Sequence, residues 1–149
     1  MIVLYTSSGC WSCRKAKQWF KDKNIKYIEK NLFTTLLKED ELRFLLSRSE
    51  NGTDDIISKR SKVIKDNNID IDSMPLSELI SFVQQNPSVL KRPIILNEKS
   101  MVVGYDESEI EIFDQQIKNL RFECLKDSCP NYQVCGKCRE EDDDWWKKY

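Results

Sequence analysis

Two cysteines near the N-terminus have a spacing that suits reversible thiol chemistry. In the motif Cys10-Trp11-Ser12-Cys13 the second thiol follows the first by three residues, about one helical turn, so a small disulfide could close between them. The motif follows the apolar run Ile2–Tyr5 and a Gly-led turn, and it opens an amphipathic helix. Cys10 is therefore expected at the helix N-terminus, where free N–H groups and the helix dipole favour a thiolate. We predict that Cys10 is the exposed attacking thiol and Cys13 the more buried resolving thiol.

The absence of histidine narrows the chemistry open to these thiols. The chain has no histidine, which excludes Ser-His-Asp catalysis, Cys-His catalysis and any His-ligated metal. An activated cysteine must therefore depend on the helix dipole or on nearby arginine and lysine. Arg60 and Arg92 are the candidate electropositive partners of Cys10; the alternative is that both are solvated surface arginines.

A proline follows Arg92 at the start of an apolar strand. In Arg92-Pro93-Ile94 the proline comes after a long helical stretch, a position compatible with a cis peptide bond. In thioredoxin-like folds such a proline faces the active-site cysteine. An ordinary trans proline at a strand edge is the alternative.

A second group of cysteines lies near the C-terminus. Cys124, Cys129, Cys135 and Cys138 fall within fifteen residues, and four thiolates suit a tetrahedral zinc ion. The first spacing is looser than in most zinc sites, and unstructured, oxidisable thiols are the alternative. We expect no required cofactor; zinc in this tail is the one candidate.

Composition limits the class of protein. The 149 residues are 40% hydrophobic and 33% charged, which is typical of a soluble globular chain. No apolar run approaches the roughly 20 residues of a membrane span, and the N-terminus lacks a secretory signal, so we expect a cytoplasmic protein with no membrane partner. The net charge of −1 gives no whole-molecule field for nucleic acid, so DNA contact is expected through a partner or a local patch.

The element pattern predicts an α/β fold. A strand at 2–5, a helix at 11–22 and a strand at 25–28 would form a parallel βαβ unit. Helices are then expected at 37–46, at 53–64 and from Pro75 to about residue 86, followed by a hairpin at 93–96 and 101–103 and a last helix capped by Asp106. We therefore predict a thioredoxin-like core at 1–33 and 89–120, a helical insertion at 34–88 and a cysteine-rich acidic tail at 121–149.

Several motifs in order resemble the Spx regulators, the redox-responsive global transcription regulators of low-GC Gram-positive bacteria, within the arsenate-reductase-like (ArsC) family. The resemblance covers about residues 1–118. It is carried by Tyr5-Thr6-Ser7-Ser8-Gly9-Cys10 with Cys13-Arg14-Lys15-Ala16, by the stretch from Asn51-Gly52-Thr53 to Arg60-Ser61, by Met74-Pro75-Leu76, and by Arg92-Pro93-Ile94-Ile95 through Val103-Gly104-Tyr105.

The resemblance implies a binding protein rather than an enzyme. Spx-like proteins bind the C-terminal domain of the RNA polymerase α subunit, and disulfide formation in the CxxC motif under thiol stress changes which promoters the complex uses. The implied switch is Cys10 with Cys13, the implied α-binding position is Gly52, and Arg60 is implied to act in the oxidised state. Contact with DNA would occur mainly through polymerase, and degradation by the ClpXP protease with an adaptor at the C-terminal end is also implied.

The chain departs from the family pattern at two places. Arsenate reductases of this type use one catalytic cysteine and three arginines around the oxyanion; here Arg60 and Arg92 match two of these arginines, and Gly104 stands at the third. An arsenate-reductase-like or glutaredoxin-like thiol oxidoreductase is therefore the alternative function. The cysteine-rich tail is the second departure, and it could add a further sensor or a metal site.

Overall fold

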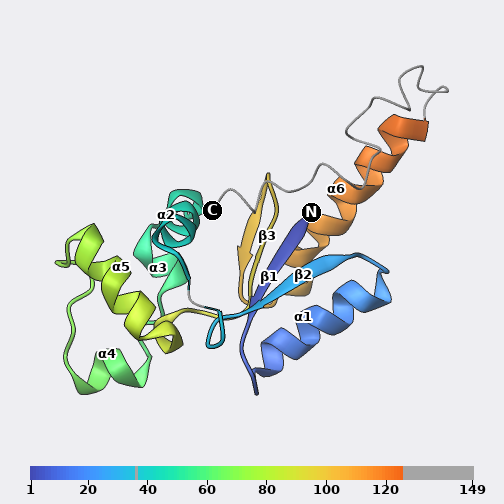
Figure 1. Ribbon diagram of the computed structural model, residues 1–149. Coiled ribbons are helices and arrows are strands. Elements are labelled where there is room, and N and C mark those ends of the chain that lie inside the picture. The colour runs from blue at the N-terminus through green and yellow to red at the C-terminus, as the bar shows by residue number, and fades with distance from the viewer. Residues whose placement is uncertain (36, 126–149) are drawn as a thin grey trace.

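A four-stranded sheet forms the centre of the molecule. The computed structural model describes residues 1–35 and 37–125. Strands β1 (Ile2–Thr6), β2 (Tyr27–Asn31), β3 (Ile94–Leu96) and β4 (Met101–Val103) lie in the order β2-β1-β3-β4. β1 pairs parallel to β2, whereas β3 runs antiparallel to both β1 and β4 (Figure 1). The predicted βαβ unit and the predicted hairpin are both present.

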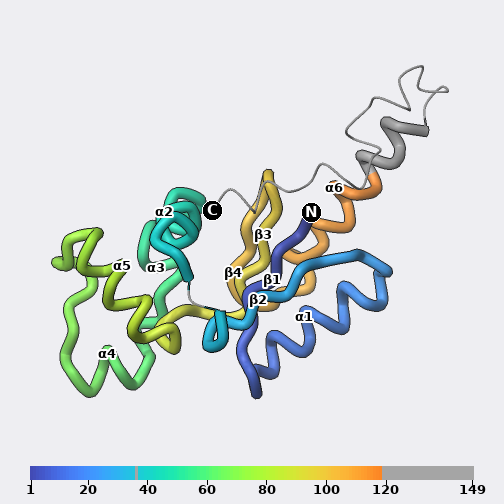
Figure 2. Tube along the Cα trace, viewed as in Figure 1, coloured from blue at the N-terminus to red at the C-terminus, as the bar shows by residue number. Residues whose placement is uncertain are grey.

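The two faces of the sheet carry different helices. Side chains of successive strand residues point to opposite faces, and Leu4 and Ile95 pack with helices α1 (Trp11–Asp22) and α6 (Glu107–Leu125). Val3 and Ile94 instead pack against the helices inserted between β2 and β3. Figure 2 shows this insertion on the opposite side of the sheet from α1 and α6. The predicted thioredoxin-like core with an inserted helical subdomain is therefore confirmed.

Local sequence explains where α1 begins and ends. Cys10 is the N-cap, and the buried side chains of Cys13, Ala16 and Phe20 form one stripe at helical spacing. The chain leaves the helix through Asn24, which has a φ of 52°. The helix prediction at 11–22 is confirmed, but the prediction that a strand starts at Ile25 is wrong, because Ile25 closes the turn by donating its amide to the Phe20 carbonyl.

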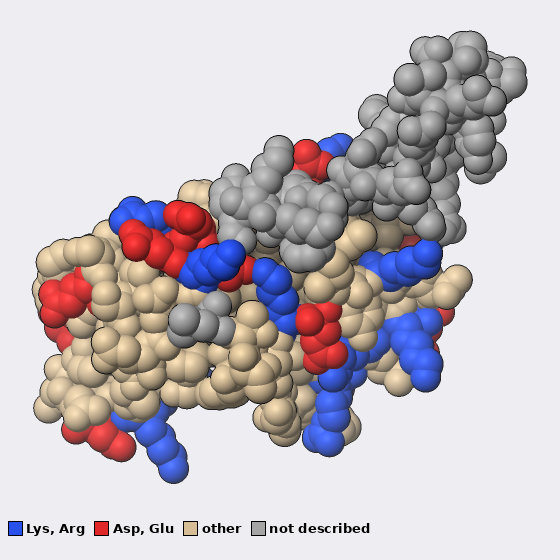
Figure 3. Space-filling model, viewed as in Figure 1, with Lys and Arg blue, Asp and Glu red and all other residues tan. Residues whose placement is uncertain are grey.

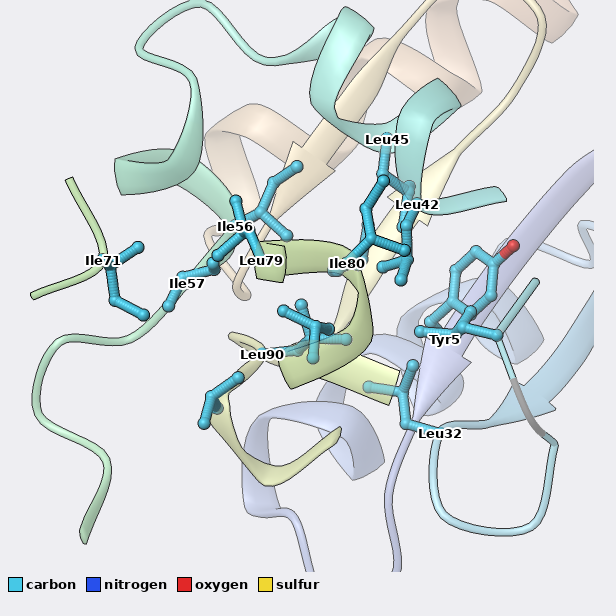
Figure 4. Packing of buried hydrophobic residues seen from close by; sticks show 14 of the residues in the cluster. Tyr5, Leu32, Leu42, Leu45, Ile56, Ile57, Ile71, Leu79, Ile80 and Leu90 are labelled. Carbon is cyan, nitrogen blue, oxygen red and sulfur yellow. The ribbon is translucent and has the colours of Figure 1, made fainter. Parts of the chain in front are cut away.

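The insertion contains four α-helices and a short 3-10 helix. They are α2 (Glu39–Arg48), α3 (Thr53–Ile56), α4 (Lys62–Asp66), α5 (Leu76–Gln85) and the 3-10 helix η1 (Pro87–Val89). Their apolar side chains meet those of the sheet in one cluster, in which Tyr5, Leu42 and Ile80 lie together (Figure 4). Leu76, in the first turn of α5, is 46% exposed.

The prediction of one helix over residues 53–64 is wrong. Ile57 is extended, with φ −98° and ψ 133°, and forms an antiparallel bridge with Leu90. The Ser58 amide donates to the Val89 carbonyl at 2.8 Å, so this segment takes its hydrogen bonds from a distant part of the chain. A second helix starts only where the Ser61 hydroxyl caps α4.

The C-terminal helix extends past the expected start of the tail. α6 continues to Leu125, so the helix crosses position 121. The Asp106 carboxylate accepts the amides of Ser108 and Glu109, as expected for its N-terminal cap. Within residues 1–35 and 37–125, none of the helices has the length and apolar character that crossing a membrane requires.

Candidate redox site and the Gly52 turn

Cys10 and Cys13 lie together at the start of α1. The Cys10 amide donates to the Ser7 carbonyl at 3.4 Å, which turns the chain from β1 into the helix. The Cys10 Sγ then accepts a hydrogen bond from the Cys13 amide at 3.2 Å. Both residues are free thiols. The predicted position of the motif, with Cys10 at the helix N-terminus, is confirmed.

The two thiols differ in their access to solvent. Cys10 is partly exposed, whereas Cys13 is only 1% exposed. Burial, and then the hydrogen bond with Cys10, raise the pKa of Cys13 to about 12; a backbone hydrogen bond from Ser7 and the charge of Arg92 act in the opposite direction. Cys13 therefore stays protonated at neutral pH, while Cys10 is the thiol that a reagent in solution meets first.

Arg92 is the arginine that reaches the cysteine site. Its Nη1 donates to the Ser7 hydroxyl at 3.0 Å, and its guanidinium lies 5.6 Å from the centre of the exposed Phe33 ring. The Arg92–Pro93 peptide bond is cis, and Pro93 is buried at the start of β3. Sequence reasoning found Arg92 and Pro93 but missed Ser7 and Phe33, since neither has a signature beyond its place in a turn or after a strand.

Arg60 has a different environment. It is exposed in the segment between α3 and α4. In the part of the chain that the structure describes, it forms no hydrogen bond or ion pair, and Arg92 is the arginine whose charge acts on Cys13. The structure therefore brings Arg92, and not Arg60, to the thiols in their reduced form.

Gly52 occupies an exposed turn ahead of α3. Its φ of 63° and ψ of −126° lie in a region of backbone dihedral angles that glycine adopts readily and that residues with a Cβ atom rarely adopt. The Asp55 carboxylate holds the turn, because it accepts the backbone amides of Glu50 at 2.9 Å and Asn51 at 2.8 Å. These hydrogen bonds, those of Asn51 first, keep the pKa of Asp55 below its usual value. An added Cβ at Gly52 would meet nothing within 4 Å, so this position is open to a partner.

A short path joins the thiols to this turn. Lys91, the neighbour of Arg92, donates its backbone amide to the Ile56 carbonyl at 2.7 Å. Its Nζ donates to the Asp54 carbonyl at 2.6 Å. Lys91 thus binds the carbonyls of α3, the helix that Gly52 opens, while Arg92 binds Ser7 beside the cysteines.

Two further positions bear on enzymatic and metal chemistry. Gly104 has a φ of 97°, and its amide donates to the Pro93 carbonyl at 2.7 Å; an arginine at this position would be strained. Among the side chains that the structure describes, those of residues 1–35 and 37–118, no group of three or more metal-ligating residues is present. Of the predicted zinc ligands, Cys124 belongs to the last turn of α6. Cys129, Cys135 and Cys138 lie outside the described residues.

Comparison with known proteins places the chain in a family. The ArsC family matches residues 5–113. Proteins from Staphylococcus saprophyticus and Staphylococcus aureus, both named global transcriptional regulator Spx, are 50% identical over 113 residues, which are 76% of this chain and 86% of each relative.

Solved structures agree on the fold. An ArsC family related protein from Bacteroides fragilis has a TM-score of 0.66 and 23% identity, covering 74% of this chain and 95% of that one. An arsenate reductase from Vibrio cholerae has a TM-score of 0.61 and 16% identity, covering 76% of this chain and 95% of that one. The chain belongs to the ArsC family, in its group of Spx regulators.

Proposed function

We propose that this protein is a redox-responsive global regulator of transcription, and not an enzyme. The observation that carries the proposal is the 50% identity to Spx regulators over 86% of their length. The regulator would bind the C-terminal domain of the RNA polymerase α subunit through the Gly52 turn and sense thiol stress through Cys10 and Cys13. It would work in the cytoplasm and contact DNA mainly through polymerase.

The sensing step follows from the two unequal thiols. With hydrogen peroxide as oxidant, the deprotonated Cys10 attacks one peroxide oxygen, which gives a sulfenic acid and, after protonation of the leaving hydroxide, water. Cys13 then attacks the sulfenic sulfur, its proton leaves with the hydroxyl group as a second water, and the Sγ–Sγ bond forms. Two thiols lose two protons and two electrons in total, and the peroxide gains them.

The path through Arg92 and Lys91 supports transmission of this step to the Gly52 turn. Disulfide formation removes the thiol protons of Cys10 and Cys13 and so changes the hydrogen bonds next to Ser7. The Ser7 hydroxyl accepts a hydrogen bond from Arg92. A shift of Arg92 would move Lys91, which holds α3 at two carbonyls. Arg60, exposed in the reduced form, would gain its role only after this rearrangement.

The α-binding surface is tested by substitution at Gly52. Gly52→Arg adds a long cation to the open turn and strains the backbone, so we expect it to abolish the complex with the α C-terminal domain in gel filtration. Gly52→Ala is the matched control, because it carries the same backbone strain without the long side chain. It should retain binding within about fivefold, a loss of about 1 kcal/mol. If Gly52→Arg still bound, the assigned surface would be wrong.

The C-terminal end carries the remaining expectations of the proposal. Recognition by ClpXP with an adaptor would keep the regulator scarce, and a longer half-life after loss of the protease would support it. The zinc prediction for Cys124, Cys129, Cys135 and Cys138 is tested by metal analysis of the full-length protein beside a variant in which Cys135 and Cys138 are serine. Absence of zinc from the full-length protein would leave the oxidisable-thiol alternative.

A thiol oxidoreductase is the second candidate. It is favoured by the partly exposed Cys10 thiol and by the charge of Arg92 acting on the neighbouring Cys13, and it is disfavoured by the positive φ of Gly104. This candidate predicts turnover of arsenate or of a disulfide substrate with a competent reductant, and loss of turnover in Cys10→Ser. The regulator predicts no turnover above that of the Cys10→Ser variant.

A further inference from the structure

The turn ahead of α3 contains an asparagine followed by a glycine. Asn51 directly precedes Gly52, whereas the other three glycines of the chain follow serine, valine and cysteine. The side-chain amide of an asparagine can be attacked by the backbone nitrogen of the next residue, and glycine has no Cβ atom to crowd that nitrogen. Of all the asparagines in this chain, Asn51 therefore meets the least steric hindrance to this reaction.

The structure leaves the attacking nitrogen open to solvent. Asn51 and Gly52 are both exposed. Within residues 1–35 and 37–125 the Gly52 amide donates no hydrogen bond. The two amides before it, those of Glu50 and Asn51, are instead held by the Asp55 carboxylate at 2.9 Å and 2.8 Å. The Gly52 nitrogen is thus free in a turn whose neighbouring amides are bound.

Asp55 also restrains the group that would be attacked. The Asn51 Nδ2 donates to the Asp55 Oδ1 at 3.0 Å. This hydrogen bond holds the side-chain amide against Asp55, and the reaction requires the Asn51 Cγ atom to rotate onto the Gly52 nitrogen. Because the hydrogen bond is exposed, it opens through local fluctuations of the turn. Asp55 therefore sets how often the Asn51 side chain is free to react.

We propose that Asn51 and Gly52 form a site of spontaneous deamidation and isomerisation, restrained by Asp55, which inactivates the partner-binding turn with time. The consequence for binding rests on the proposed function, because Gly52 is the position proposed to meet the α C-terminal domain. The modification itself depends only on the chemistry of the turn.

The reaction needs no reactant other than water. The Gly52 nitrogen attacks the Asn51 Cγ atom and loses its proton, the Cγ–Nδ2 bond breaks, and ammonia leaves with that proton. The product is a cyclic succinimide. Water then opens the ring: cleavage between the nitrogen and Cγ gives aspartate, and cleavage between the nitrogen and the main-chain carbonyl carbon gives isoaspartate. In sum, one amide and one water become one carboxylic acid and ammonia, and no electrons are transferred.

The two products change the turn to different extents. Both replace the Nδ2 donor by a carboxylate close to Asp55, which removes a hydrogen bond and adds a like charge. Solvent screens this repulsion, and Figure 3 shows the inserted helices as mostly uncharged on the face in view, with acidic and basic side chains in small groups. Isoaspartate also inserts a methylene group into the backbone and so displaces Gly52. We expect isoaspartate to weaken binding more than aspartate does.

The first test measures the modification in the full-length protein without a partner. The protein is incubated at neutral pH, and mass spectrometry with isoaspartyl methyltransferase labelling measures the products at each asparagine. Asn24 and Asn67 are matched controls in the same molecule, because both are exposed and are followed by residues with a side chain. Position 51 should convert while these two asparagines remain intact. Conversion at position 51 no faster than at Asn24 and Asn67 would overturn the proposal.

Two variants test the roles of the turn residues. Asp55→Ala should convert faster at position 51, and unchanged rates at Asn24 and Asn67 would show that the chain stays folded. Asn51→Gln should form no isoaspartate, because its longer side chain cannot close the same ring. An unchanged rate at position 51 in Asp55→Ala would contradict the restraint by Asp55.

The second test measures the consequence for binding. Aged wild-type protein is mixed with the α C-terminal domain and separated by gel filtration. Isoaspartate at position 51 should be enriched in the uncomplexed fraction by about fivefold or more, and aspartate, which has the same charge on an ordinary backbone, should be enriched less. Equal proportions of isoaspartate in both fractions would overturn the effect on binding. If fresh protein forms no complex, the proposed function is refuted, while mass spectrometry still decides whether the modification occurs.

Discussion

At the scale of single residues, the cysteine site is asymmetric because its two thiols occupy different environments. Cys13 is enclosed by the start of α1 and by Ser7, and burial raises its pKa to about 12. Cys10 lies at the surface end of the same turn. This arrangement would shield Cys13 until Cys10 has reacted, as the proposed sensor of oxidants requires.

The raised pKa of Cys13 predicts alkaline destabilisation. Between pH 9 and 12 the unfolded chain loses the Cys13 proton and the folded chain keeps it, so the free energy of unfolding falls as pH rises, by up to about 1.4 kcal/mol per pH unit from this thiol. Cys13→Ala should show a shallower decline, measured by urea unfolding in a reducing buffer from pH 7 to 11. An equal decline of the free energy of unfolding with pH in the two proteins would contradict the raised pKa of Cys13.

At the scale of elements, a partly buried ion pair joins the inserted helices to the sheet. Glu41 of α2 is 4% exposed and pairs with Lys30 of β2. It also accepts the Tyr5 hydroxyl at 3.2 Å and the Lys38 amide at 3.1 Å. Burial, and then the carboxylate of Glu41, raise the pKa of Tyr5, so the phenol remains a donor. The carboxylate thus ties α2 to both parallel strands.

Removal of this carboxylate should destabilise the fold. Glu41→Ala removes the buried acceptor of the Tyr5 hydroxyl and the carboxylate that pairs with Lys30, and we expect it to lower the free energy of unfolding by about 3 kcal/mol. Glu39→Ala, on the same helix, breaks an exposed pair with Arg43 and should cost no more than about 0.5 kcal/mol. Urea denaturation measures the free energy of unfolding of both variants. Similar losses would contradict a larger contribution to stability from the buried Glu41 carboxylate.

The contact between Lys91 and α3 gives a prediction about coupling. Lys91→Met removes the Nζ bond to the Asp54 carbonyl and leaves the backbone bond to Ile56. Loss of one exposed hydrogen bond of about 1 kcal/mol should weaken the α C-terminal domain complex about fivefold, with little change in Tm. Lys62→Met, on α4, is the control. If calorimetric titration shows that both variants bind the α C-terminal domain as tightly as the wild type, Lys91 does not influence the Gly52 turn.

Elements set by local residues could be predicted, and those set by distant contacts could not. The α1 helix follows from its cap at Cys10 and the stripe of Ala16 and Phe20. The break after Ile56 arises from pairing of Ile57 with Leu90, which no local pattern indicates. The burial of Glu41 could not be predicted either, because Glu41 follows two exposed acidic residues at the start of α2.

At the scale of the whole molecule, the sheet separates the thiol site from the Gly52 turn. The thiols lie at the junction of β1 and α1, and the Gly52 turn lies in the inserted helices. Arg92 and Lys91, at the end of the insertion, contact both the thiol site and α3. The molecule can therefore link a chemical change at one end of α1 to a partner bound on the other side.

A pull-down of the RNA polymerase α C-terminal domain and a promoter fragment by the full-length protein tests whether the cysteine pair controls transcription complexes. It is run with reduced and oxidised wild type and with Cys10→Ala, which cannot form the disulfide. We expect the α domain to be recovered in every case and oxidation to change the recovery of DNA in the wild type alone. Failure to recover the α domain in either redox state, or an equal oxidant response in Cys10→Ala, would contradict it.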